Sequence, residues 1–146
     1  MQAILFIGIQ ATGKSTFFRL KFADTHVRIN LDMLKTRRRE SLLLNACLEG
    51  RQPFVVDNTS PAKEDRERYI AAAREARFDV VGYYFESKIA DALERNASRD
   101  ESSRVPRAGV LGTYNKLQLP ELSEGFSVLF YVQLSAGGFT VKEWSP

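Results

Sequence analysis

Short apolar runs alternate with segments of helical periodicity along most of the chain. The continuous apolar run from Ala3 to Ile7 ends at Gly8, as expected for a strand that is buried on both faces. From Gly13 onward, apolar residues recur three and four positions apart, as Phe18 and Phe22 do. The pattern therefore predicts a buried strand, a turn and an amphipathic helix at the start of the chain.

Strand and helix patterns continue to alternate beyond this first unit. The predicted strands cover 3–7, 26–30, 53–57, 78–85 and 126–134, and the last of them is expected to pair with 139–144. The first predicted helix starts at Gly13, and the second covers 42–48 up to Gly50. The third runs from a cap at Ser60-Pro61 to about 77, the fourth runs from a cap at Ser87 to 95–99, and a short helix is expected after Pro106. This order predicts an α/β fold with a mostly parallel five-stranded sheet, helices on both faces and ligands at the carboxyl ends of the strands.

Composition narrows the picture to one ordinary folded domain. The 146 residues are 44% hydrophobic and 27% charged, and the formal net charge is +3, which permits anionic partners. No apolar run approaches the roughly 20 residues that cross a bilayer, and the single cysteine, Cys47, excludes an intrachain disulfide. We expect a single domain over 1–146 in the cytoplasm, without a membrane partner or an evident obligate protein partner.

The turn after the first strand carries the clearest motif. Residues 8–15, Gly-Ile-Gln-Ala-Thr-Gly-Lys-Ser, fit G-x-x-x-x-G-K-[ST] between a strand and a helix. Such a loop directs several backbone N–H groups and a helix N-terminus at one anion, so we predict a phosphate-binding loop for ATP. Lys14 is expected to reach the β- and γ-phosphates, Ser15 to ligate Mg²⁺, and Thr16 to contact the α-phosphate. The predicted nucleotide-binding residues are Gly8, Gln10, Ala11, Thr12, Gly13, Lys14, Ser15 and Thr16.

The rest of the chain separates the classes of protein that share this loop. A GTPase needs a base-reading N-K-x-D, and the nearest candidate, 115–118, is Asn-Lys-Leu-Gln without the aspartate. Motor and helicase ATPases need a larger core. A small phosphotransferase fits best, with a nucleotide-binding module that does not transfer phosphate as the alternative.

Two aspartates follow predicted strands at the edge where the phosphate-binding loop lies. Asp32 is the candidate general base that accepts the proton of an incoming hydroxyl, or else it only caps the following helix. Asp57 ends an apolar strand and is the candidate for holding Mg²⁺ and facing the substrate, or else it belongs to a turn with Asn58. Thr59 extends this polar cluster towards the substrate.

Basic residues gather in two further segments. Lys35 and Arg38, from the run 35–39, are the candidates for guiding the acceptor, and the alternative is a solvated helix face. The polar segment 99–116 is expected to be a lid that closes over ATP, and the alternative is an ordinary exposed loop. Arg95 and Arg99 are its expected nucleotide contacts, and Arg104 is its expected catalytic arginine.

Five segments carry a resemblance to a known family. They are GIQATGKST, RINLDMLK, VVDNTSP, ERNASR and RVP, in order along nearly three quarters of the chain. With these segments the chain resembles the kinase module of polynucleotide 5′-hydroxyl kinases, found in phage end-healing enzymes, and related stand-alone P-loop kinases. The resemblance implies a P-loop kinase fold, ATP and Mg²⁺ as cofactors, and Asp32 as the residue that activates the 5′-hydroxyl.

The chain departs from the family pattern at two positions. Lys35 stands where the family has an arginine that binds the acceptor phosphate, so the charge remains and the forked geometry is lost. Leu111 stands where the family has its lid arginine, so Arg104 or Arg107 would have to substitute.

The sequence therefore predicts a kinase that moves the γ-phosphoryl group of ATP to a hydroxyl, with the 5′-hydroxyl of DNA or RNA as the expected acceptor. A metabolite, sugar or antibiotic is the alternative acceptor, and a regulatory module without transfer is the alternative outside the enzymes.

Overall fold

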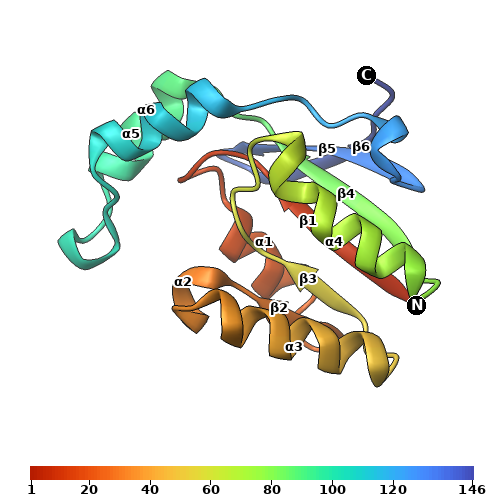
Figure 1. The fold of residues 1–146 in the computed structure, drawn as a ribbon. Helices are drawn as coiled ribbons and strands as arrows, with labels where there is room; N and C mark the ends of the chain where they lie inside the picture. The colour runs from red at the N-terminus through yellow and green to blue at the C-terminus, as the bar shows by residue number, and fades with distance from the viewer.

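Five parallel strands and one antiparallel strand form a single sheet in the computed structural model, which describes residues 1–146 (Figure 1). The strands are β1 (Gln2–Ile7), β2 (Val27–Ile29), β3 (Phe54–Val56), β4 (Asp79–Phe85), β5 (Val128–Ser135) and β6 (Gly138–Glu143), in the order β2-β3-β1-β4-β5-β6. The predicted α/β class with a mostly parallel sheet is confirmed. The sheet has six strands instead of five because the run at 139–144 joins it, antiparallel to β5.

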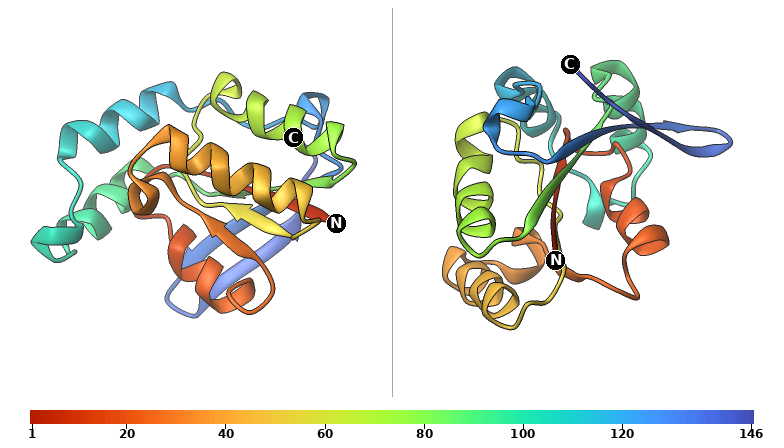
Figure 2. Two further views of the ribbon diagram at one scale, coloured as in Figure 1. Left: turned by 60° about the horizontal axis from the view of Figure 1, so that its bottom comes forward. Right: turned by 90° about the vertical axis from the view of Figure 1, so that its right-hand side faces the viewer.

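Six α-helices and two 3-10 turns connect these strands. They are α1 (Lys14–Lys21), α2 (Leu31–Leu34), α3 (Arg37–Glu49), α4 (Lys63–Glu75), α5 (Ile89–Ala97), α6 (Arg107–Lys116), η1 (Glu101–Ser103) and η2 (Leu122–Glu124). Helices α3 and α4 cover one face of the sheet and α1 covers the other, as the end-on view in Figure 2 shows. None of the helices combines the length and apolar character that crossing a bilayer requires.

Strand β1 fills both halves of the core because its side chains alternate between the two faces of the sheet. Ala3, Leu5 and Ile7 belong to a cluster of 16 buried residues under α3 and α4. Ile4 and Phe6 belong to a second cluster on the face covered by α1. A central strand that is apolar at every buried position is typical of parallel sheets covered on both sides.

Aromatic rings dominate the face covered by α1. The ring of Phe17 lies 5.9 Å from that of Phe6, 5.4 Å from that of Phe85 and 5.1 Å from that of Phe139 on β6, all edge-on. Edge-on contacts at these distances add to the stabilisation from burial. This helix, which carries the phosphate-binding loop at its start, is therefore fixed to strands β1, β4 and β6.

Two predicted helix starts are wrong, and one helix was not predicted. Helix α4 begins at Lys63, and the Asp65 carboxylate accepts from the amide of Ala62, while Ser60 lies in a left-handed turn before it. Helix α5 begins at Ile89, and Ser87 stays outside it as a buried residue. The four-residue helix α2 is too short to show a periodic pattern in the sequence.

We expect Phe17→Ala to lower the free energy of unfolding by about 3–5 kcal/mol, because it removes a buried ring and leaves a cavity among the aromatic residues. The measurement is urea denaturation followed by circular dichroism. The control is Leu20→Ala on the same helix, where the side chain is 67% exposed and the expected change is below about 0.5 kcal/mol. Equal losses in the two variants would contradict the assigned packing of α1.

Candidate active site

The phosphate-binding loop, residues 8–15, is held from below by the loops that follow β3 and β4. The amide of Gly8 donates to the Thr59 carbonyl oxygen at 3.0 Å, and the amide of Ile9 donates to the Ser87 hydroxyl at 3.1 Å. Thr12 closes the turn by donating its hydroxyl to the Ile9 carbonyl oxygen at 2.9 Å. Ser87 therefore supports the phosphate-binding loop, and this replaces its predicted role as a helix cap.

Gly13 is the position in this loop that requires a glycine. Its φ is +94°, a value that L side chains rarely adopt, and a Cβ there would lie 2.7 Å from the Phe139 ring. The residue directly precedes α1, so the amides at the start of the helix continue those of the loop. This geometry is the one that binds phosphate in proteins with the same motif.

Lys14 lies at the centre of the loop. Its Nζ donates to the carbonyl oxygens of Gly8, at 2.9 Å, and Ile9, at 2.7 Å. Burial lowers the pKa of Lys14 to about 8, against the opposing attraction of Asp57. The desolvated ammonium group thus has an incomplete set of counter-charges, which favours binding of an anion such as a phosphate group.

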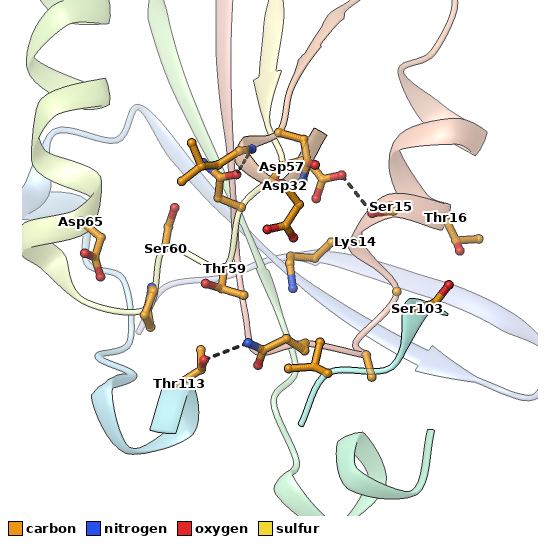
Figure 3. A pocket seen from close by; sticks show the side chains of 18 of the residues that line it. Lys14, Ser15, Thr16, Asp32, Asp57, Thr59, Ser60, Asp65, Ser103 and Thr113 are labelled. Atoms are coloured by element: carbon orange, nitrogen blue, oxygen red, sulfur yellow. Dashed lines mark hydrogen bonds between the residues drawn. The ribbon is translucent and has the colours of Figure 1, made fainter. Parts of the chain in front are cut away.

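Asp57, Ser15 and Arg28 form a closed set of hydrogen bonds beside Lys14. The Ser15 hydroxyl donates to Asp57 Oδ2 at 3.1 Å, Arg28 Nε donates to the same oxygen at 2.9 Å, and Arg28 Nη2 donates to Ser15 Oγ at 3.0 Å. Asp57 is only 2% exposed, at the end of β3. The two residues predicted to hold a metal therefore meet, as Figure 3 shows. Arg28, which the sequence did not suggest, binds to both of them.

Asp32 faces the phosphate-binding loop from the short helix α2. Asn30 caps this helix, since its side-chain oxygen accepts from the amide of Met33 at 2.9 Å, so Asp32 is not the cap. Asn30 also donates to the Asp57 carbonyl oxygen at 2.6 Å and ties α2 to the end of β3. In Figure 3 the Asp32 carboxylate and the Lys14 amine point into the same space.

One cavity of about 920 Å³ joins these groups. Only four of its 25 lining residues are hydrophobic, so its ligands are polar. The charged residues that line it are Lys14, Arg19, Arg37, Arg68, Arg99 and Lys116, and Asp32, Asp57, Asp65 and Asp100. The excess of cations favours anionic ligands.

A wall of the cavity comes from α3 and α4; the sequence placed Arg37 in the basic run 35–39 without selecting it, and did not suggest Arg68 or Glu40. Arg37 Nη1 donates to Glu40 Oε1 at 2.9 Å, and Arg68 Nη2 lies 3.6 Å from the same oxygen. Both guanidinium groups also donate to the Tyr69 hydroxyl, at 3.1 and 3.2 Å. Glu40 is 2% exposed, so a buried carboxylate holds two half-exposed arginines at the cavity.

This wall also raises the pKa of the Tyr69 hydroxyl, because the group is buried and donates to the negatively charged Glu40. Asn58 adds a further donor to Glu40, at 3.1 Å. The contacts join residues about 30 positions apart, and no local sequence pattern reports them.

Two of the residues predicted to bind the acceptor lie outside the cavity. Lys35, at the end of α2, and Arg38, on α3, are exposed and do not line the cavity, whereas Thr59 does. Arg38 projects from a different side of its helix than Arg37, which is one position away. Arg37 thus takes the place in the cavity that the sequence assigned to Arg38.

The predicted lid, residues 99–116, borders the cavity through η1 and α6. Arg99 lines it, while Arg104 is exposed and donates to the Arg99 carbonyl oxygen at 2.8 Å. Arg95 lies just outside, with its guanidinium 3.4 Å from the carbonyl oxygens of Ala11 and Leu134. Arg107 is also exposed and outside the lining, so Arg99 is the only lid arginine that borders the cavity.

Gln10 links the phosphate-binding loop to α6. Its Nε2 donates to the Thr113 hydroxyl at 2.9 Å, and its Oε1 is buried without a hydrogen-bond partner. Buried polar atoms of this kind normally find a partner. Gln10 lines the cavity, and its Oε1 remains a buried acceptor without a partner.

Ser15 and Asp57 supply hard oxygen donors at one point, which fits Mg²⁺. The protein contains no group of three or more His, Cys, Asp or Glu side chains that could hold a metal ion by themselves. Further ligands would have to come from a bound nucleotide and water, as in other P-loop proteins.

Known proteins resemble the chain in sequence and in structure. It is 25% identical over 130 residues to the bifunctional polynucleotide phosphatase/kinase of Schizosaccharomyces pombe, and the match covers 86% of this chain and 32% of that protein. The chain thus spans about a third of the length of this relative. No protein-family model matches.

Among solved structures, Kti12 from Chaetomium thermophilum, in complex with ADP-AlF3, has a TM-score of 0.68 at 14% identity over 92% of both chains. A gluconokinase from Sinorhizobium meliloti has a TM-score of 0.62 at 18% identity over 90% of this chain and 81% of its own. The chain has the P-loop kinase fold. A putative kinase from Chloroflexus aurantiacus agrees, with a TM-score of 0.66 at 18% identity over 93% and 89% of the two chains.

The match to the Schizosaccharomyces pombe protein confirms the resemblance that the sequence motifs indicated. The solved structures show the fold of the chain.

We expect Lys14 to titrate near pH 8, below the ordinary lysine value, because burial desolvates its charged form. The measurement is a ¹³C NMR titration of the lysine Cε resonances, with Lys14 assigned by its loss in Lys14→Met. Added ADP should raise this pKa, since phosphates favour the charged ammonium group. A midpoint near 10.5 without nucleotide would contradict the burial of Lys14.

Proposed function

We propose that the protein is an ATP- and Mg²⁺-dependent kinase that phosphorylates the 5′-hydroxyl end of DNA or RNA. One arrangement supports this most strongly: a single cavity is lined by the phosphate-binding lysine, by a free carboxylate and by a pair of arginines anchored on a buried glutamate. The lysine is Lys14, the carboxylate is that of Asp32, and the two arginines are Arg37 and Arg68.

In the proposed reaction the acceptor oxygen attacks the γ-phosphorus while the bond to the β–γ bridging oxygen breaks and ADP leaves. Asp32 accepts the proton of the hydroxyl, a role that fits a pocket carboxylate for which no hydrogen bond to another side chain is found. Lys14 and the amides of residues 8–15 hold the β- and γ-phosphates, and Arg99 from the lid offsets charge on the transferred group. Mg²⁺, held by Ser15 and through Asp57, would neutralise the phosphate oxygens.

Arg37 and Arg68 favour an acceptor that already carries a phosphate. Each guanidinium has donors beyond those engaged by Glu40 and Tyr69, and an arginine fork matches the oxygens of a phosphate. In a polynucleotide, a phosphate lies one nucleoside away from the 5′-hydroxyl, whereas a neutral sugar or antibiotic has none. The name of the curated relative, which includes a polynucleotide kinase, agrees with this acceptor class.

We expect Asp32→Asn to lower kcat for phosphorylation of a 5′-hydroxyl oligonucleotide by about 10²–10⁴-fold, because the amide cannot accept the proton. The measurement is transfer of label from γ-labelled ATP. Binding of ATP, followed by calorimetry, should stay within a factor of a few of the original. The control is Asp24→Asn, which removes an exposed carboxylate outside the cavity.

The acceptor class is tested in the same assay with 5′-hydroxyl DNA and RNA oligonucleotides, nucleosides, sugars and aminoglycosides. Label on a small molecule without a phosphate and none on the oligonucleotides would replace the polynucleotide proposal by a small-molecule kinase. Full turnover by Asp32→Asn would reject the assignment of the base.

We expect Arg37→Gln and Arg68→Gln each to raise KM for the oligonucleotide about tenfold, with little change in KM for ATP. One lost charge-assisted contact to phosphate has about this effect. The slope of log KM against log salt concentration should also become shallower, because fewer counterions are released.

Arg38→Gln provides the comparison, since it removes the neighbouring arginine, which points away from the cavity. A larger effect of Arg38→Gln than of Arg37→Gln would return the acceptor site to the residue that the sequence suggested.

A further inference from the structure

An arginine side chain sits on the two groups that fit a metal ion. Arg28 Nε contacts Asp57 Oδ2 at 2.9 Å and Arg28 Nη2 contacts Ser15 Oγ at 3.0 Å, while Ser15 itself donates to Asp57. The single hydroxyl hydrogen of Ser15 is thereby used on Asp57, and the acceptor side of its oxygen faces Arg28. A metal ligated by Ser15 would need that same acceptor side.

Arg28 compensates the negative charge of Asp57, whose burial without a counter-charge would destabilise the fold. Asp57 is 2% exposed, and Lys14, which interacts with it electrostatically, donates its hydrogen bonds to the carbonyl oxygens of Gly8 and Ile9. Loss of Arg28 without a replacement would leave Asp57 buried with one poorly placed counter-charge. A second cation is therefore needed at this point in every state of the site.

Arg28 also has room to leave. It lies on β2, the strand at one edge of the sheet, and its side chain is 27% exposed and lies beside the ring of Phe18 at 6.0 Å. An arginine at an edge strand can turn into solvent without disturbing the core.

We propose that Arg28 is an internal counter-cation that exchanges with the divalent metal at Ser15 and Asp57. Before the metal binds, the guanidinium compensates Asp57 and holds Ser15 in place. When the metal binds, the two cations would share the same oxygens and repel each other, so Arg28 moves out. The exchange makes metal binding weak on the bare protein and strong once a nucleotide adds its phosphate charges, because Ser15 and Asp57 alone must compete with Arg28.

This inference rests on the proposed metal site and does not depend on which acceptor is phosphorylated. Its consequence is an order of events: metal and nucleotide enter together, and the metal alone does not occupy the site at concentrations that saturate the nucleotide complex.

We test the exchange by measuring binding of Mn²⁺, as a paramagnetic replacement for Mg²⁺, from the EPR signal of the free ion, with and without ADP. We expect Arg28→Gln to bind Mn²⁺ without nucleotide about tenfold more tightly than the original protein, the size of effect expected when one like charge a few ångströms away is removed. Lys21→Gln, which removes an exposed charge at the end of α1, should leave the affinity unchanged.

Asp57→Asn separates the two proposals. If Asp57→Asn abolishes the tight Mn²⁺ binding while Arg28→Gln leaves the affinity equal to or weaker than that of the original protein, the metal site stands and the exchange is wrong. If Mn²⁺ binding is insensitive to Asp57→Asn, the metal site itself is wrong and the exchange falls with it.

A measurement on the unaltered protein covers the case in which Arg28→Gln does not fold. The Nε–H signal of Arg28 is followed by ¹H–¹⁵N NMR as Mg²⁺ is added to the ADP complex. Loss of the hydrogen-bonded chemical shift and faster exchange with water are expected at saturation. A signal that keeps its shift and its protection under those conditions would overturn the exchange.

Discussion

The parallel pairing of β3 between β1 and β2 is the constraint on which the site depends. Leu5 and Ile29 both pair with Val56, so β2 and β3 end level with each other and β1 runs two residues further, to Ile7. The loops that follow them carry the phosphate-binding loop, α2 with Asp32, and Asp57. A shift of β3 by one residue would turn Asp57 to the other face of the sheet and separate it from Ser15. The chemistry of the cavity is thus fixed by strand register before any side-chain contact is made.

The buried acidic groups around the cavity are paired with arginines, whereas the buried lysine has no such partner. The buried carboxylates Asp57 and Glu40 each hold arginines, whereas Lys14 is desolvated among carbonyl oxygens. A buried charge costs less when it is paired than when it is alone, and a buried cation with few counter-charges favours an incoming anion. The phosphate end of a nucleotide and a phosphate on the acceptor would therefore meet different cations in one continuous space.

The sequence predicted the parts of the site that are formed by residues close together in the chain. The loop at 8–15 is a local motif, and Asp32 and Asp57 could be placed because each follows a strand whose end must face that loop. Arg37 belongs to a basic run that the sequence noted, but Arg28, Arg68 and the anchoring of Arg37 and Arg68 around Glu40 and Tyr69 could not be predicted, because most of these contacts join separate elements. Ser87 illustrates the same limit. Its position in the sequence suggests a helix cap, yet its hydroxyl accepts a hydrogen bond from the amide of Ile9 in the neighbouring loop.

The contact between Gly13 and Phe139 joins the two ends of the chain at the nucleotide-binding loop. The ring of Phe139 fills the space that a side chain at position 13 would need, and it packs on Phe17 one turn later in α1. The β5–β6 hairpin extends beyond the sheet on the α1 side in Figure 2, and its packing against the loop helps to determine the conformation of the loop. In the history of such a protein, residues 13, 17 and 139 would be expected to change as a set, and a homologue lacking the hairpin would have to cover the same glycine with a different segment.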